Sequence, residues 1–264
     1  MKIKLTVEYH GEEFKGWQFQ PGRRTVEQEL GKALNIYLAS LAKKIQIVLP
    51  NPIGLTASGR TDSGVHANGQ VVNFTWPEQL VFDSGKLLEA LNGITPRDIG
   101  IVSADAVSDK FNARIAAHTK CYRYYLMQRR PRSPMFGDRV WHIYLPLNVG
   151  PMIEAAKLFR GTHNFQTFQA VDCHAKTTVR TVIDSQLVRV DSEFLIFTIQ
   201  GKGFLKNMVR KIVGTLVEVG RDKISVEEVR EMIEYPDRDK CGPTAPARGL
   251  FLEWVRYHEN FEIK

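Results

Sequence analysis

The chain has little cysteine and no long apolar run. Its 264 residues include 3 cysteines, which lie far apart and form no Cys-x-x-Cys pair: Cys121, Cys173 and Cys241. A disulfide framework needs an even set of cysteines and a zinc knuckle needs close pairs, so neither is supported. No apolar stretch approaches the length of a membrane span. We therefore expect reduced thiols, no structural metal and no membrane segment.

The first residues also lack the apolar core of a signal peptide. Residues 1–9 alternate between polar and apolar side chains in the manner of a strand. Apolar residues make up 43% of the chain and charged residues 25%, which is ordinary for a globular protein of one large or two moderate domains. These features predict a cytoplasmic protein.

Acidic residues are too few to balance the basic ones. The chain has 36 Lys and Arg against 29 Asp and Glu, a formal charge of +7. Such an excess is expected for a protein that binds a polyanion. Basic clusters at 129–132 and 202–206 have aromatic residues beside or within them, a combination that suits single-stranded or looped nucleic acid. A solvated basic face above core aromatics explains the same composition equally well.

The first half of the chain has the pattern of a β-α-β-β-α-β unit. Thr25 begins a Thr-x-x-Gln capping box with Gln28, and Asp83 or Ser84 is an ordinary helix N-cap. This order of elements is that of the ferredoxin-like unit. The elements expected are strands at 2–9, near 45–49, at 69–76 and at 99–106, and helices at 25–42 and 84–93.

The second half repeats this pattern without visible sequence identity. Apolar residues within 204–219 recur at the spacing of one buried helical face. We predict an α+β protein of two pseudo-symmetric ferredoxin-like halves, 1–110 and 111–264, with antiparallel sheets and a basic cleft between them. The remaining elements expected are strands at 118–128 and 249–257, a helix at 150–160, and a hairpin of 179–190 and 194–200 that turns at Asp191 and Ser192.

One acidic loop stands out in the first half. Asp62 lies in Gly59-Arg60-Thr61-Asp62-Ser63-Gly64, directly before a predicted strand. Reactive groups are commonly displayed on such loops, although Asp also favours ordinary turns. A second Asp-Ser-Gly at 83–85 invites an aspartic-protease interpretation. That interpretation fails because the second copy begins a helix, whereas a carboxylate dyad needs two equivalent loops.

The longer segment containing Asp62 resembles the active-site signature of the TruA family of tRNA pseudouridine synthases. Further matches occur in the same order along essentially the whole chain. Small departures, such as His10 where the family often has Asp and Phe251 where it often has Tyr, lie outside the expected catalytic residues. The matching segments are Gly59–Ala67, Tyr9–Gly11, Phe14–Pro21, Thr25–Val26, Phe111–Arg114, Tyr122–Tyr124, Gly161–Phe168, Gly203–Gly214 and Gly242–Leu250.

The resemblance implies an isomerase that converts uridine to pseudouridine in the anticodon stem-loop of tRNA, at nucleotides 38, 39 and 40. The reaction moves the bond between ribose C1′ and uracil from N1 to C5, and it requires no cofactor or metal. The resemblance also implies that the protein is a homodimer. Two rivals remain: the same chemistry on another RNA, and an RNA-binding relative without catalysis.

Three residues match the family's catalytic group. Asp62 matches the catalytic aspartate, which attacks the sugar or the base or removes a ribose proton. Arg210 matches the cation that pairs with this carboxylate, and such a cation opposes the rise in pKa that burial causes. Tyr122 matches the tyrosine that stacks on the flipped base, and its hydroxyl is a candidate for shuttling the C5 proton.

Other residues are candidates for binding the substrate. Arg60 is placed to contact RNA phosphate or to fill the space left by the flipped base, although a plain salt bridge is its bland explanation. Phe204 and Leu205 either line the uracil pocket or pack below it. His66 has no companion ligands at metal spacing, so we do not expect it to take part in catalysis.

Overall fold

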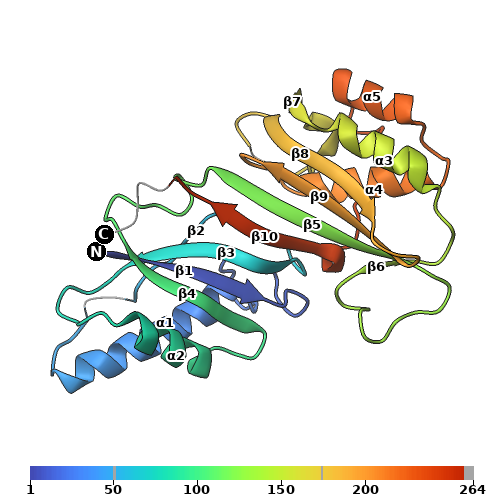
Figure 1. Ribbon diagram of the computed structural model, residues 1–264. Helices are drawn as coiled ribbons and strands as arrows, with labels where there is room; N and C mark the ends of the chain where they lie inside the picture. The colour runs from blue at the N-terminus through green and yellow to red at the C-terminus, as the bar shows by residue number, and fades with distance from the viewer. Residues whose placement is uncertain (50–51, 174, 259–264) are drawn as a thin grey trace. The chain divides into compact units, whose positions relative to one another are not determined.

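The computed structural model describes residues 1–49, 52–173 and 175–258 and shows an α+β protein whose strands are mostly antiparallel (Figure 1). The chain divides into two compact units, Met1–His118 with Leu252–Lys264, and Thr119–Phe251. Strand β10 (Leu250–Arg256) contributes residues to both units. Within the described ranges, no helix is both long and apolar enough to cross a bilayer.

The first unit has the predicted β-α-β-β-α-β order. Its strands are arranged β4-β1-β3-β10, with the short β2 paired to β3. In β1 every second residue is buried, which places one face of this strand in the core. Helices α1 and α2 lie on the same side of these strands (Figure 1). The elements are β1 (Lys2–Tyr9), α1 (Val26–Lys44), β2 (Thr56–Ala57), β3 (His66–Thr75), α2 (Ser84–Ile94) and β4 (Ile99–Val107).

The predicted strand near 45–49 is wrong. Helix α1 continues to Lys44 and ends where Gln46 takes a left-handed conformation, with φ of 58°. Ile45 and Val48 are 51% and 93% exposed, so these apolar side chains supply no buried strand face. The second strand of the unit is the two-residue β2 further along the chain.

The predicted capping box of α1 is also wrong, because the Thr25 side chain makes no cap hydrogen bond. The preceding segment satisfies the helix instead, since Gly16 O and Trp17 O accept the N–H groups of Val26 and Glu27. The predicted N-cap of α2 is confirmed. Asp83 Oδ1 accepts the Lys86 N–H at 2.9 Å.

The second unit contains the predicted strand, helix and hairpin, together with elements that were not expected. Its strands are arranged β5-β9-β8-β7, and β6 pairs with β5 in parallel. The short strands β6 and β7 and the helix α5 were missed. The elements are β5 (Thr119–Gln128), β6 (Trp141–Ile143), α3 (Val149–Leu158), β7 (Gly161–Asn164), β8 (Val179–Arg189), β9 (Phe194–Gly201), α4 (Met208–Gly220) and α5 (Val226–Glu234).

Helix α4 begins at Met208, later than the apolar pattern predicted. Asn207 has φ of 61°, which breaks the helix before this point. Leu205 nevertheless stays 5% exposed, so its side chain joins the buried set from an irregular segment. The apolar spacing therefore identified buried side chains correctly but placed the start of the helix too early.

Candidate active site

Asp62 lies on a tight turn between β2 and β3 of the first unit. The Val65 N–H donates to Asp62 O at 3.1 Å, and Gly64 has φ of 77°. Before the turn, the Ser58 N–H donates to Val71 O at 2.8 Å, which ties the loop back to β3. The Asp62 side chain is half-buried, whereas the preceding Thr61 is buried. The turn therefore holds the backbone firmly and leaves Asp62 as a whole half-buried.

The segment between β1 and α1 clamps this turn. The Trp17 N–H donates to Thr61 O at 3.1 Å, and the Gly64 N–H donates to Phe14 O at 3.2 Å. Gly16 has φ of 87°, and a Cβ built there would lie 2.7 Å from Thr61 O. Only glycine fits this combination of backbone conformation and close approach. The Gly16-Trp17 step therefore belongs to the construction of the Asp62 loop.

An ion pair anchors the end of the clamping segment. Arg24 Nη1 and Nη2 donate to the two carboxylate oxygens of Asp98 at 2.6 and 2.9 Å. The guanidinium also lies 4.2 Å from the centre of the Phe14 ring. The hydrogen bond to Asp98 raises the pKa of Arg24 above its ordinary value. Bidentate geometry fixes orientation as well as distance, so this pair limits movement of the whole segment.

The two other sequence candidates in the first unit differ in exposure. Arg60 is exposed, so its guanidinium can reach solvent or a ligand. His66 is 1% exposed, and its Nδ1 accepts the Gly11 N–H at 2.9 Å. An accepting Nδ1 carries no proton, so this ring is held in one tautomer. The structure thus gives His66 a part in joining β3 to the segment after β1.

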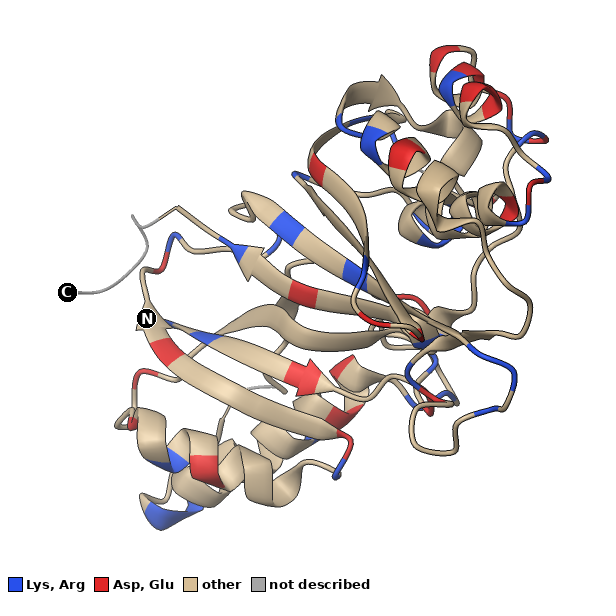
Figure 2. Ribbon diagram, turned by 45° about the vertical axis from the view of Figure 1, so that its right-hand side comes forward, with Lys and Arg blue, Asp and Glu red and all other residues tan. Residues whose placement is uncertain are grey.

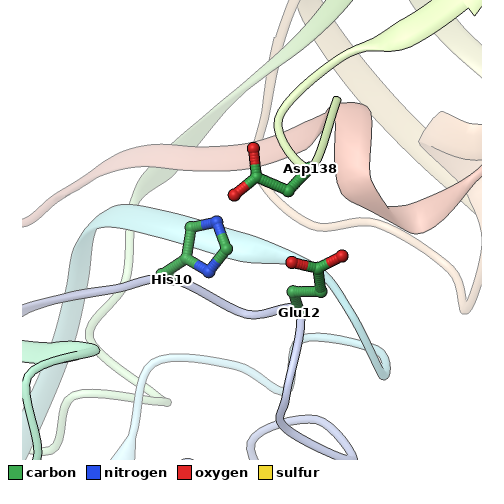
Figure 3. Close-up of side chains that lie close together, drawn as sticks. All are labelled: His10, Glu12 and Asp138. Carbon is green, nitrogen blue, oxygen red and sulfur yellow. The ribbon is translucent and has the colours of Figure 1, made fainter. Parts of the chain in front are cut away.

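Figure 3 shows three side chains of metal-ligand type: His10 and Glu12, which follow β1, and Asp138, which follows β5. His10 and Glu12 belong to the first unit, and Asp138 belongs to the second. Zinc sites use three or four protein ligands, and neither unit supplies that number from this group. We assign no metal to these residues. The His10 ring instead packs 4.6 Å from the His66 ring within the first unit.

In the second unit, Tyr122 and Phe204 lie together. Tyr122 is half-buried on β5, and the centre of its ring is 5.1 Å from that of Phe204 at an interplanar angle of 82°. Edge-to-face packing of this kind fixes the orientation of an aromatic ring. Tyr124, two residues further, is fully buried and donates its hydroxyl to Pro246 O at 2.7 Å. Tyr122 and Tyr124 therefore have different environments: Tyr122 is partly accessible and Tyr124 lies in the core.

Arg210 lies in the first turn of α4 and is half-buried. Its Nε donates to Ala245 O at 2.7 Å, and its Nη1 donates to Asn207 Oδ1 at 3.1 Å. One turn later, a Cβ on Gly214 would lie 1.6 Å from Pro243 O, so the loop after α5 crosses the helix at this glycine. These contacts hold the guanidinium in one place instead of leaving it on a flexible side chain. Such preorganisation is expected of a group that stabilises charge.

The structure thus groups the sequence candidates by unit. Asp62, Arg60 and His66 belong to the first unit, whereas Tyr122, Phe204, Leu205 and Arg210 belong to the second. The sequence did not reveal the buried residues that hydrogen bond near the Asp62 loop. Tyr9 and Gln70 are the clearest, since both are buried and both hydrogen bond near this loop. The only sequence signal for Tyr9 or Gln70 was a polar group at a buried position of a strand.

A model of the tRNA pseudouridine synthase family matches residues 155–258. That match covers less than half of the chain and points to the class of pseudouridine synthases, which the nearly full-length relatives establish. The tRNA pseudouridine synthase A of Geobacter sulfurreducens is 41% identical over 97% of this chain and 99% of the relative. The enzyme of the same name from Bacillus subtilis is 40% identical over 98% of this chain and 100% of the relative. The chain belongs to the tRNA pseudouridine synthase A family.

A solved Cbf5-Nop10-Gar1 complex contains a more distant likeness. It covers 81% of this chain and 53% of the other, with 11% identity and a TM-score of 0.31. A likeness of this size carries no argument about the site. The family assignment rests on the nearly full-length sequence relatives.

Proposed function

We propose that this protein is an isomerase that converts uridine to pseudouridine in tRNA, within the anticodon stem-loop at nucleotides 38, 39 and 40. The observation that carries the proposal is the half-buried Asp62 on a firmly held turn, in a chain 41% identical to a tRNA pseudouridine synthase A over 97% of its length. The relatives' name supports tRNA as the substrate. Modification of tRNA in turn supports a cytoplasmic location.

The reaction needs one well-placed carboxylate and no external reagent. The bond between C1′ and N1 breaks, the uracil turns, and a bond forms between C1′ and C5. The C5 proton leaves and N1 gains a proton, so the product is an isomer of the substrate. Asp62 starts this sequence by attacking C1′, by attacking the base, or by removing a ribose proton. Each of these first steps uses the ionised form of Asp62, so a neighbouring cation favours all three.

The remaining residues have roles that follow from their chemistry. Arg210 pairs with Asp62 and keeps its carboxylate ionised, and the contacts that preorganise its guanidinium support this role. Tyr122 stacks on the flipped uracil and shuttles the C5 proton. Phe204 and Leu205 shape the uracil pocket, and Arg60 contacts RNA phosphate or occupies the gap left by the flipped base.

The two halves have different parts in this proposal. Residues 1–110 supply the aspartate loop, and residues 111–264 supply Tyr122, Arg210 and most of the RNA-binding charge. We propose that they are pseudo-symmetric ferredoxin-like halves that enclose a basic cleft. We also propose a homodimer in which one tRNA spans both subunits. Light scattering at micromolar concentration tests the dimer, because a lone species near the chain mass of 30.1 kDa would contradict it.

The function is tested by incubating the protein with unmodified tRNA and mapping pseudouridines by carbodiimide-dependent primer-extension stops. We expect stops in the anticodon arm with the wild type and none with Asp62→Asn. A protein that produces no pseudouridine in any RNA would be a non-catalytic RNA-binding relative. Stops outside the anticodon arm would change the substrate, and an active Asp62→Asn variant would remove Asp62 from catalysis.

A further inference from the structure

Thr61, the residue directly before Asp62, is held from two directions. Its hydroxyl and the Tyr9 hydroxyl are 2.7 Å apart, and its carbonyl oxygen accepts the Trp17 N–H at 3.1 Å. The residue is 6% exposed, so water has little access to these bonds. With the side chain and the backbone both fixed, Thr61 determines the direction in which the chain enters Asp62.

Tyr9 is itself held firmly at the end of β1. It is 3% exposed, and its ring lies 6.2 Å from the Trp17 ring. The pairing of β1 with β3 shifts register between Val7 and Tyr9, a bulge that redirects side chains at the end of the strand. Burial raises the pKa of Tyr9, while hydrogen bonds from Thr61 and Gln70 oppose this shift. The hydroxyl therefore remains protonated at neutral pH and keeps both its donor and its acceptor functions.

Gln70 supports the same loop one step earlier. Its side chain is fully buried on β3, where Oε1 accepts from Ser58 Oγ at 2.7 Å and Nε2 donates to Gly59 O at 3.0 Å. A single planar amide thus binds two successive residues of the loop. Together, Tyr9 and Gln70 bind the chain on both sides of Arg60. Apolar side chains of similar size would fill this space without needing hydrogen-bond partners. The polar groups of Tyr9 and Gln70 therefore serve to bind the loop and not only to fill the core.

We propose that Tyr9 and Gln70 are positioning residues for Asp62, which act through Thr61 and Gly59 and do not touch the substrate. This inference rests on the proposed function, since it requires Asp62 to be the reacting carboxylate. A lone carboxylate that must meet a flipped uridine depends strongly on its position. Misplacement by about 1 Å costs about 100-fold in rate for a reaction that depends on orientation.

The direct test compares Tyr9→Phe and Thr61→Val with Thr61→Ser in single-turnover assays on unmodified tRNA. Tyr9→Phe and Thr61→Val each remove one partner of the same hydrogen bond, so we expect each to lower the rate constant about tenfold at unchanged tRNA affinity. The double variant should lose less than the two single losses combined, because both changes remove the Tyr9–Thr61 hydrogen bond, while Tyr9→Phe also removes the one with Gln70. Thr61→Ser keeps the hydroxyl and should retain nearly the wild-type rate. Gln70→Met should lower the rate in the same way.

Thr95→Val provides a matched structural control in the same unit. Thr95 is buried, and its hydroxyl hydrogen bonds with Leu91 O and with Ile99 O, the β4 residue that pairs with Tyr9, so its loss perturbs the same neighbourhood while leaving the Tyr9–Thr61 bond in place. It should lower the unfolding midpoint by an amount similar to Tyr9→Phe without changing the rate constant. Equal rates for folded Tyr9→Phe and wild type, or a Thr61→Ser rate as low as that of Thr61→Val, would overturn the positioning role.

The failure of this inference differs from failure of the proposed function. An inactive Asp62→Asn protein together with a fully active Tyr9→Phe protein refutes only the positioning role. An active Asp62→Asn protein, or a wild type that forms no pseudouridine, refutes the function on which that role rests. Near-ultraviolet circular dichroism at the assay temperature establishes that each variant is folded, so a low rate cannot arise from unfolding.

Discussion

The two units differ in charge more than in size. Residues 119–251 contain 21 Lys and Arg against 14 Asp and Glu, whereas the rest of the chain contains 15 of each. Figure 2 marks the basic residues of the described chain in blue and the acidic ones in red. The whole net charge of +7 therefore comes from the second unit. The proposed catalytic aspartate therefore belongs to the neutral unit, and the charge that we propose attracts RNA belongs to the basic one.

The segments that hold Asp62 and Arg210 also differ between the two units. In the first unit the Asp62 turn is held by the side chains of Tyr9 on β1 and Gln70 on β3, and by the backbone of the segment before α1. In the second unit Arg210 is held by the loop after α5, which crosses α4 at Gly214. Each unit has a glycine at a close approach beside a candidate residue, Gly16 against Thr61 O in the first and Gly214 against Pro243 O in the second. Substitution of these glycines tests the two constructions separately.

The largest expected effect is that of Gly214→Ala. Its Cβ would lie 1.6 Å from Pro243 O, so the loop must move off the helix. We expect a loss of about 4 kcal/mol in the free energy of unfolding, at the upper end for a single substitution. Chemical denaturation measures it. Gly31→Ala is the control, since among the described residues no atom beyond its own helix lies within 4 Å of its Cβ, and it should be neutral or slightly stabilising. A stable Gly214→Ala protein would contradict the close approach.

Gly16→Ala should have a smaller effect on stability and a clear effect on activity. The residue has φ of 87°, and its Cβ would lie 2.7 Å from Thr61 O. We expect a loss of about 2 kcal/mol and a displaced Asp62 loop. Gly22→Ala separates strain from contact, since Gly22 has φ of 69° but, in the part of the chain that the structure describes, its Cβ would meet nothing within 4 Å apart from its chain neighbours. A rate constant lowered equally by both substitutions would show that the contact with Thr61 is unimportant.

The sequence predicted the elements that depend on a local pattern of residues. Alternation predicted β1 and the β8–β9 hairpin, and in β1 and β9 every second residue is buried; it also predicted β3, which is buried on both faces. Asp83 was a correct cap because its partner lies three residues away. Local patterns failed where a distant segment decided the outcome. The cap of α1 comes from the backbone of Gly16 and Trp17, and not from the side chain of Thr25.

The site was predictable to a similar extent. Motif resemblance proposed Asp62, Tyr122 and Arg210, whose roles stay predictions, and the structure adds how each is held. The resemblance could not identify Tyr9 or Gln70 as partners of the loop, because their contacts join segments far apart in sequence. A buried tyrosine at the end of a strand is indistinguishable from an ordinary core residue until its hydroxyl is seen beside Thr61. The residues that position the loop are recognised by their hydrogen bonds to it and not by their residue type.

The charge difference between the units is tested with paired substitutions of exposed cations. Arg130→Gln with Arg132→Gln removes two positive charges from the second unit, and Lys43→Gln with Lys44→Gln removes two from the first. The first pair should weaken tRNA binding by about 1 kcal/mol or less per charge and lower the salt slope by about 1 for each phosphate that is no longer neutralised. The second pair should leave both unchanged. Filter binding at several salt concentrations gives the slopes, and equal effects would refute a basic second unit as the binding face.

The smallest expected effect concerns the acidic helix caps, one in each unit. The backbone N–H of Lys86 holds the pKa of Asp83 below its ordinary value of 3.8, and hydrogen bonds from Ser225 hold that of Glu228 below its ordinary value of 4.5. Because both folded pKa values are lowered, each group stabilises the protein above its ordinary pKa. That contribution is lost as the pH falls through the folded pKa.

Asp83→Asn and Glu228→Gln keep a hydrogen-bond acceptor but cannot titrate. Each variant should therefore be slightly less stable than wild type at neutral pH, and the difference should vanish as the pH falls below about 4. Hydrogen exchange of α2 and α5 across this range measures the two caps separately. If the units unfold independently, Asp83→Asn will change exchange only in the first unit and Glu228→Gln only in the second. If both variants change exchange in both helices, the two units unfold in one cooperative transition. The units then differ in net charge but not in stability.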